Sequence, residues 1–219
     1  MEMSYKRVIA TTFFPKYIGF LDKLNRTPLF AEFVKENRNV ISFDTREEMY
    51  DDLMKKYPGA IDYLEFGVFQ GKSILYWADK NKEAASRFTG FDTFTGLPED
   101  WDYHKKGAFN VDGKAPLTQD SRIKFVKGLF QDTLPGFLSD FSRKNRIVIH
   151  NDSDLYSSSL YLLTRLHDVI APGTIIIFDE FGNVQHEFRA FFDYLSAYRR
   201  SYKVVSASYQ YYTAAVEML

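Results

Sequence analysis

Residues 62–73 constrain the fold of this 219-residue chain more than any other stretch. They read Asp-Tyr-Leu-Glu-Phe-Gly-Val-Phe-Gln-Gly-Lys-Ser, so a short apolar run ends in an acid, and two glycines then bracket a turn. Glycine lets the main chain approach a ligand closely, and a helix that follows offers free N–H groups at its start. The pattern predicts a strand, a turn and a helix placed against a nucleotide-like ligand. An ordinary strand-to-helix turn is the alternative interpretation of this motif alone.

The spacing of the two glycines narrows the choice of ligand. It is Glu-x-Gly-x-x-x-Gly, which differs from the Gly-x-Gly-x-x-Gly fingerprint of dinucleotide sites. This difference favours S-adenosylmethionine over a nicotinamide cofactor. A second short strand ends at Asp92, where an acid is placed to accept hydrogen bonds from both ribose hydroxyls.

Strand and helix patterns alternate from Ile61 onward, which predicts an α/β sheet with helices on both faces. Most of this sheet is expected to be parallel, with an antiparallel pair at the end of the chain. The expected strands are residues 63–66, 87–91, 123–126, 146–150, 174–178, 203–207 and 213–218. Helices are expected from about Ser157 and over residues 188–198, where apolar side chains recur at helical spacing.

The first sixty residues read differently, as helices and turns without strand alternation. We expect residues 1–60 to form a helical cap over the cofactor edge of a core formed by residues 61–219, within one folding domain. Pro28 suits the first turn of one helix. Asp44-Thr45 resembles the N-cap of another helix, which Pro58-Gly59 ends.

Two further strand ends carry acids that should meet at one rim. Asp152 follows the fourth expected strand, and Asp179 and Glu180 follow the fifth. Because ligands of open α/β sheets bind outside the carboxyl ends of the strands, we expect these acids to face the same site. Carboxylates gathered in this way repel one another unless a cation offsets the charge, and oxygen ligands suit Mg²⁺. Helix capping is the structural alternative, with Asp154 as a candidate cap for the helix near Ser157.

The four histidines and one loop complete the candidate residues. His150 ends an apolar strand and is interpreted as a hydrogen-bonded core residue, and His167 as a structural residue within a helix. His104 and His186 are weaker candidates for contact with a substrate. Residues 101–116 form a polar and aromatic loop beside the expected cofactor position, which suggests a lid or an acceptor-binding segment.

Composition excludes several classes of function. The chain has 28 basic and 29 acidic residues with no Lys/Arg block, so nucleic acid is not an expected partner. Cysteine is absent, which removes disulfides and thiolate catalysis. No apolar run approaches the length of a membrane span, so we expect a cytoplasmic protein without a membrane partner. Exposed tyrosines in residues 209–212 could join a homodimer contact.

Together the ordered motifs resemble class I S-adenosylmethionine-dependent methyltransferases, and specifically the macrocin O-methyltransferase family. The matching stretches are residues 64–68 with 71–73, 90–94 with 96–98, 128–135, 152–158 and 178–181. The resemblance implies a Rossmann-like methyltransferase fold and a divalent metal held by Asp152, Asp179 and Glu180. It also implies that the cofactor site includes Glu65, Gly67, Phe69, Gly71, Ser73, Asp92, Thr93, Gly128 and Phe130.

Members of this family methylate sugar hydroxyls on natural products. We therefore expect Mg²⁺-assisted O-methylation of a sugar or polyhydroxylated small metabolite, with Asp152 as the base. The chain departs from the family pattern at Glu180, where an aspartate is usual, at Phe181, where a tyrosine is usual, and at Asn151, where the usual residue is apolar. The alternatives are a catechol-like acceptor, or an interaction protein that binds S-adenosylmethionine without turnover.

Overall fold

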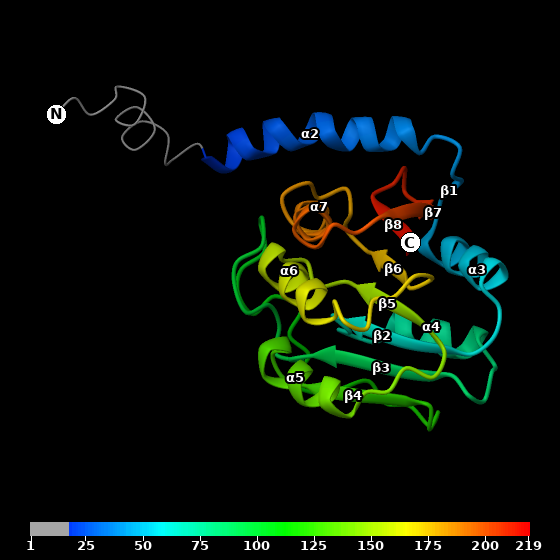
Figure 1. Ribbon diagram of the computed structural model, residues 1–219. Coiled ribbons are helices and arrows are strands. Elements are labelled where there is room, and N and C mark those ends of the chain that lie inside the picture. The colour runs from blue at the N-terminus through cyan, green and yellow to red at the C-terminus, as the bar shows by residue number, and fades with distance from the viewer. Residues whose placement is uncertain (1–17) are drawn as a thin grey trace, which may run out of the picture.

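The computed structural model of the protein describes residues 18–219, and their side chains from residue 23 onward. It contains a sheet with the strand order β1-β7-β8-β6-β5-β2-β3-β4 (Figure 1). The strands are β1 (Ser42–Phe43), β2 (Ile61–Phe66), β3 (Arg87–Asp92), β4 (Ile123–Lys127), β5 (Arg146–Asn151), β6 (Ile175–Phe178), β7 (Tyr202–Ser208) and β8 (Thr213–Met218). The helices are α2 (Ile18–Glu36), α3 (Arg46–Lys56), α4 (Lys72–Lys80), α5 (Phe130–Asp140), α6 (Tyr156–Arg165) and α7 (Glu187–Tyr198).

The predicted sheet is confirmed. Strands β2 to β6 pair in parallel, and β8 runs antiparallel between β6 and β7. The chain builds outward from β2 through β3 to β4, and then returns to place β5 on the other side of β2. That reversal creates a switch point between β2 and β5, where open α/β sheets bind their ligands.

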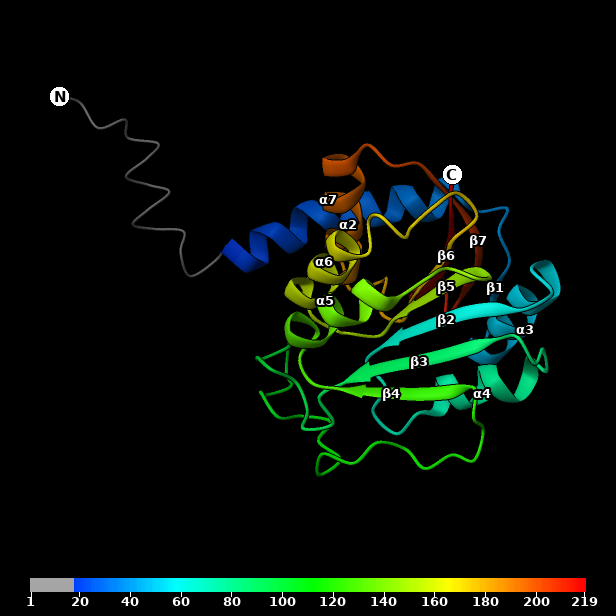
Figure 2. The same cartoon turned by 60° about the horizontal axis from the view of Figure 1, so that its bottom comes forward.

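Helices cover both faces of the sheet, as Figure 2 shows most clearly. One apolar cluster joins Leu64 and Phe66 of β2 to residues of α5, α6 and α7. A second cluster joins Tyr63 of β2 to Met49 of α3 and Trp77 of α4. Successive residues of β2 alternate between the two clusters because side chains of a strand point to opposite faces. All six residues of β2 are buried, including the acids Asp62 and Glu65, because helices cover both faces of this central strand.

The region expected to form a helical cap contains helices and also a strand. The prediction of no strand there is wrong, because Ser42 and Phe43 of β1 pair in parallel with β7. A strand of two residues is too short to produce an alternating pattern. Pro28 lies inside α2 rather than in its first turn, and the proline side of this helix is exposed. Residues 1–17 of the predicted cap lie outside the described residues.

Helix α3 begins as predicted. Thr45 is its N-cap, and a capping box with Glu48 satisfies two backbone N–H groups at the start of the helix. Helix α2 packs elsewhere: Phe33 contacts Phe181, Phe188 and Tyr211. Its described part therefore covers α7 and the β7–β8 turn, and α3 is the helix that reaches the carboxyl ends of the strands through Arg46.

The predicted antiparallel pair at the end of the chain is confirmed as β7 and β8. Tyr209, Gln210 and Tyr211 in the turn between them all have positive φ. The Tyr211 hydroxyl donates to the carbonyls of Asn37 and Val40, so this turn anchors the C-terminal end of α2. Among the residues that the structure describes, no helix is both long and apolar enough to span a bilayer.

Candidate active site

The site forms at the edge of the sheet where the carboxyl ends of β2, β3, β5 and β6 lie side by side. Phe66 of β2 pairs with Phe91 of β3 and with Asn151 of β5, which in turn pairs with Phe178 of β6. The next residues along these strands are Gly67, Asp92, Asp152 and Asp179, so parallel register alone brings them to one edge. The predicted convergence of these residues follows from this register.

Gly67 allows two of these strand ends to touch. Its φ is +94°, and a Cβ there would collide with the main-chain carbonyl of Asp152. The N–H of Gly67 donates to Phe91, and the N–H of Asp152 donates to Phe66. The first glycine of the motif is therefore required by a backbone contact within the protein, in a conformation that other residues rarely adopt.

Asp92 organises the loop that follows β2. Its Oδ2 accepts the N–H groups of Val68 and Phe69, each at 2.8 Å, and its Oδ1 accepts the N–H of Phe94 at 2.7 Å. Phe69 adopts a left-handed conformation in this loop, with φ of +48°. A carboxylate offers about four acceptor positions, so these three bonds leave Asp92 able to accept one more.

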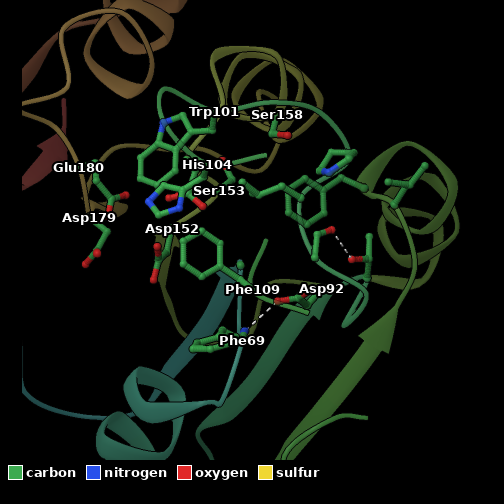
Figure 3. Close-up of a pocket in the computed structure, with 18 of the residues that line it drawn as sticks. Phe69, Asp92, Trp101, His104, Phe109, Asp152, Ser153, Ser158, Asp179 and Glu180 are labelled. Atoms are coloured by element: carbon green, nitrogen blue, oxygen red, sulfur yellow. Dashed lines mark hydrogen bonds between the residues drawn. The ribbon is translucent and has the colours of Figure 1, made fainter. Parts of the chain in front are cut away.

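A cavity of about 410 Å³ opens at this edge of the sheet. In Figure 3 the acids Asp152, Asp179 and Glu180 lie at one end and Asp92 lies at the other. The predicted site residues that line the cavity are Gly67, Phe69, Asp92, Thr93, Phe130, Asp152, Asp179 and Glu180. Leu129, within the predicted Gly128–Phe130 turn, also lines it, whereas sequence reasoning did not place Arg46, Leu97, Gln131, Ser153 or Ser158 in its wall.

Four predicted cofactor residues, Glu65, Gly71, Ser73 and Gly128, are not among the residues that line the cavity. Glu65 is buried on the α3–α4 side of the sheet, where its Oε2 accepts the hydroxyl of Tyr63 at 2.7 Å. Gly71 lies against the ring of Pro116, and Gly128 lies against Thr133. Ser73 bonds to the hydroxyl of Tyr50.

The loop between β3 and β4 supplies the aromatic part of the wall. Trp101, His104 and Phe109 line the cavity, and the rings of Trp101 and His104 stack with centroids 5.3 Å apart. Glu99 accepts a hydrogen bond from Ser157 of α6 at 2.5 Å, which ties the loop across the cavity. The loop thus lies beside the cavity, as its composition predicted.

The remaining histidines have supporting roles. His186 Nδ1 accepts the N–H of Tyr156 at the start of α6, and burial lowers the pKa of His186. It does not line the cavity.

Leu155 is the N-cap of α6 and forms no side-chain cap, so the alternative of Asp154 as a helix cap is wrong. His167 follows α6 in a turn, rather than lying within a helix, and contacts Tyr194.

Five carboxyl groups gather at the acidic end of the cavity: Asp152, Asp154, Asp179, Glu180 and Glu187. Burial, together with neighbouring acids, raises the pKa of Asp152, Glu180 and Glu187 well above their usual values. Burial raises the pKa of Asp154 to about 7. Glu187 belongs to α7 and was not predicted, because it follows no strand end and reaches the cluster only through the packing of α7.

Asp179 is the exception within this cluster because two cationic side chains flank it. Arg46 of α3 forms an ion pair with its Oδ2, and His150 Nε2 lies 3.7 Å from its Oδ1. Burial alone raises the pKa of Asp179, but His150 and Arg46 together lower it to about 2. Sequence reasoning missed Arg46, which lies 133 positions from Asp179 in the chain and follows no strand end.

His150 is fully buried, as predicted for a hydrogen-bonded core residue. The hydroxyl of Tyr63 lies 2.8 Å from its Nδ1, and Glu65 Oε2 lies 3.3 Å from the same nitrogen. Burial lowers the pKa of His150, but interactions with Asp179 and Glu65 outweigh burial and raise it to about 10. His150 therefore lies between Glu65 and Asp179, with one ring nitrogen facing each carboxylate.

Three carboxylate oxygens of the cluster are buried without a hydrogen-bond partner among the described residues: Asp179 Oδ1, Glu180 Oε2 and Glu187 Oε1. Buried polar atoms in native proteins are seldom left unpaired. Two groups of three residues bring ligand atoms within 4.8 Å of one another: His150, Asp152 and Asp179, and separately Asp152, Asp154 and Glu180. The donor set, rich in carboxylate oxygen, fits a hard divalent cation such as Mg²⁺.

Comparisons with known proteins agree with this architecture. The sequence profile of a family described as "Methyltransferase domain" matches residues 64–181. A curated relative from Streptomyces olivaceus is 29% identical over 143 residues, which are 55% of this chain and 53% of that protein. It is described as 8-demethyl-8-(2,3-dimethoxy-alpha-L-rhamnosyl)-tetracenomycin-C 4'-O-methyltransferase. The match thus spans about half the length of that relative.

Solved structures share the fold. The calicheamicin methyltransferase CalS11 superposes with a TM-score of 0.61 at 20% identity, over 97% of this chain and 89% of that one. The O-methyltransferase NovP gives a TM-score of 0.56 at 19% identity, over 78% and 76% of the two chains. An O-methyltransferase from Bacillus cereus gives 0.55 at 16% identity, over 97% and 96%. At these identities the likeness shows a common fold.

Proposed function

The chain belongs to the methyltransferase domain family, and from that premise we propose that it is an S-adenosylmethionine-dependent O-methyltransferase. Its acceptor is a hydroxyl on a sugar or a polyhydroxylated small metabolite. The curated relative is named for methyl transfer to a rhamnosyl group, which supports this class of acceptor. The observation that carries the proposal is a single cavity with the Gly67–Asp92 loop at one end and buried acids at the other.

The proposed cofactor position lies at the Gly67–Asp92 end. Asp92 retains one acceptor position there after its three bonds to the backbone, which suits a ribose hydroxyl. Gly67, Phe69, Thr93 and Phe130 surround the same end. In this proposal Glu65, Gly71, Ser73 and Gly128 act indirectly, by shaping the turns that carry the lining residues.

The chemistry proposed for the acidic end is deprotonation of the acceptor hydroxyl. The methyl group of a sulfonium is already electrophilic, so the protein must hold the acceptor oxygen in line with the methyl–sulfur bond. Asp152 is the proposed base, because it is half-buried and lines the cavity beside the other acids. Its raised pKa makes it a stronger proton acceptor than an exposed aspartate.

The cluster is also the proposed site of Mg²⁺, for which the family resemblance names Asp152, Asp179 and Glu180. A divalent cation there would offset the repulsion among the acids and lower the pKa of a bound hydroxyl. The unpartnered oxygens of Asp179 and Glu180 support this assignment. The aromatic wall of Trp101, His104 and Phe109 provides an apolar surface against which the acceptor can pack.

A methyl-transfer assay with a panel of acceptors tests the proposal. The protein is incubated with labelled S-adenosylmethionine, Mg²⁺ and either deoxysugar glycosides or simple diphenols. Transfer to the glycosides alone is the expected result. Transfer to the diphenols alone would replace the sugar acceptor with a catechol-like one. Cofactor binding without transfer to any acceptor would favour the non-catalytic alternative.

A further inference from the structure

The acidic cluster separates into two parts that differ in their partners. Asp179 is paired with Arg46, so the guanidinium already occupies one of its carboxylate oxygens. Asp154 and Glu180 instead form a group with Asp152 in which the ligand atoms lie within 4.8 Å of one another. Asp152 belongs to both groups of potential ligands.

We propose that Arg46 keeps Asp179 out of the cation site, and that the divalent cation is bound by Asp152, Asp154 and Glu180. This inference rests on the proposed function for the presence of a divalent cation at this end of the cavity. It replaces Asp179, one of the three ligands that the sequence suggests, with Asp154.

Electrostatics favours the second group of ligands. A divalent cation bound to Asp179 would lie next to the guanidinium of Arg46. Repulsion between like charges at such short range is strong in a buried site. Of Asp152, Asp154 and Glu180, only Asp152 also belongs to the group that contains Asp179. A cation bound by these three acids is therefore repelled less by Arg46 than a cation bound to Asp179.

Unpartnered oxygens provide independent support. Glu180 Oε2 is buried without a hydrogen-bond partner among the described residues, and Asp152, Asp154 and Glu180 can bring ligand atoms within 4.8 Å of one another. Glu187 is fully buried behind this group, where its Oε2 accepts the N–H of Glu180 at 3.0 Å. That bond fixes the backbone of Glu180. Glu187 Oε1 is also buried without a hydrogen-bond partner among the described residues.

The backbone of Asp154 is consistent with a role for its side chain. Its φ is +61°, a left-handed conformation in which glycine would be less strained. Neither a helix cap nor a solvent-exposed position accounts for an aspartate here, because Leu155 caps α6 and Asp154 lines the cavity.

Binding of Mn²⁺ to the full chain, followed by electron paramagnetic resonance, tests the ligand assignment without turnover or cofactor. Matched amide variants compare the two acids directly. We expect Asp154→Asn to weaken Mn²⁺ binding at least about tenfold, the low end of what even a supporting residue costs in metal affinity. We expect Asp179→Asn to change it less than about threefold, because Arg46 already occupies that carboxylate. The opposite ranking, or no Mn²⁺ binding by the wild type at millimolar concentration, would overturn the proposal.

Arg46→Met provides a second test if an amide variant does not fold. Removing the guanidinium exposes Asp179 to the cation, so Mn²⁺ binding should tighten, and Asp179→Asn should then weaken binding in the Arg46→Met background. Unchanged or weaker binding in Arg46→Met would contradict the inference. A parallel titration with S-adenosylmethionine separates this result from the proposed function, because cofactor binding can fail while the ranking of the Mn²⁺ variants still holds.

Discussion

The two ends of the cavity are built in opposite ways. At the Gly67–Asp92 end, polar groups of the protein satisfy one another: Asp92 accepts three backbone N–H groups, and Gly67 donates to β3. At the other end, five acids converge and three of their oxygens lack partners among the described residues. The first end is held together by these internal bonds, with one acceptor position of Asp92 left over. The second is completed by a cation, a proton or a substrate, and this contrast separates cofactor binding from chemistry.

The largest expected effect comes from Gly67, which joins the two ends. We expect Gly67→Ala to destabilise the protein by about 4 kcal/mol, because the new Cβ meets the Asp152 carbonyl in a conformation that alanine disfavours. Urea unfolding measures the loss. Gly107 also has positive φ but open space around it, so Gly107→Ala should cost only about 1 kcal/mol. Gly136→Ala in α5 meets no atom and should be neutral or slightly stabilising. Equal losses at all three positions would disprove the contact argument.

Asp152→Asn should separate chemistry from binding. The amide keeps the size of the side chain but cannot act as a base, so we expect kcat to fall by about 10²- to 10⁴-fold. Affinity for S-adenosylmethionine should stay within about threefold, because Asp152 lies at the other end of the cavity. Steady-state kinetics and calorimetry give the two numbers. Unchanged turnover in Asp152→Asn would exclude this residue as the base.

Asp92→Asn should have the reverse effect. The amide has one oxygen where three N–H groups need acceptors, and its NH₂ group faces donors. We expect a loss of about 2–3 kcal/mol in unfolding free energy, the scale of hydrogen bonds to a charged group. Cofactor affinity should fall with it. Normal stability and affinity in this variant would mean that the carboxylate does not organise the loop.

The smallest expected effect is a pH dependence at the acidic end. The pKa of Asp154 is raised to about 7 in the folded protein, above the value of about 3.9 for an exposed aspartate. A carboxyl group whose pKa is higher in the folded than in the unfolded protein contributes most to the free energy of unfolding at a pH where it is protonated in both states. This contribution is therefore lost as pH rises from about 4 to about 7. Urea midpoints without divalent cations should show a steeper fall over this range in the wild type than in Asp154→Asn. Identical slopes would contradict the assignment.

Asp179 and His150 should change the free energy of unfolding at acidic and at alkaline pH, respectively. The lowered pKa of Asp179 means that its contribution to stability is present above about pH 4 and is lost as pH falls toward 2. The raised pKa of His150 means that its contribution is complete below about 6.5 and is lost as pH rises toward 10. The Arg46→Met variant should lose part of the acid-side contribution.

The sequence predicted those parts of the site that depend on strand ends. The carboxyl ends of parallel strands meet at one edge, so Asp92, Asp152 and Asp179 could be placed together from their positions after apolar runs. Glu65 could not be distinguished from them in the same way. It is the penultimate residue of β2, and strand alternation sends its side chain to the α3–α4 face with Tyr63.

Residues brought in by helix packing carried no comparable signal. Arg46 and Glu187 stand in the first turns of α3 and α7, and neither follows a strand that the sequence predicted. Only the packing of those helices on the sheet shows that one side chain reaches Asp179 and the other contacts Glu180. The two-residue strand β1 was missed because its pairing with β7 has no period to detect.

Calorimetric titration with S-adenosylmethionine, carried out in parallel on the wild type, Asp92→Asn and Asp152→Asn, tests the division of the cavity most directly. NADH serves as the control ligand. We predict micromolar binding to the wild type and to Asp152→Asn, much weaker binding to Asp92→Asn, and no binding of NADH. Equal loss of binding in both variants would contradict the separation of the two ends, and no binding to the wild type would contradict the proposed function itself.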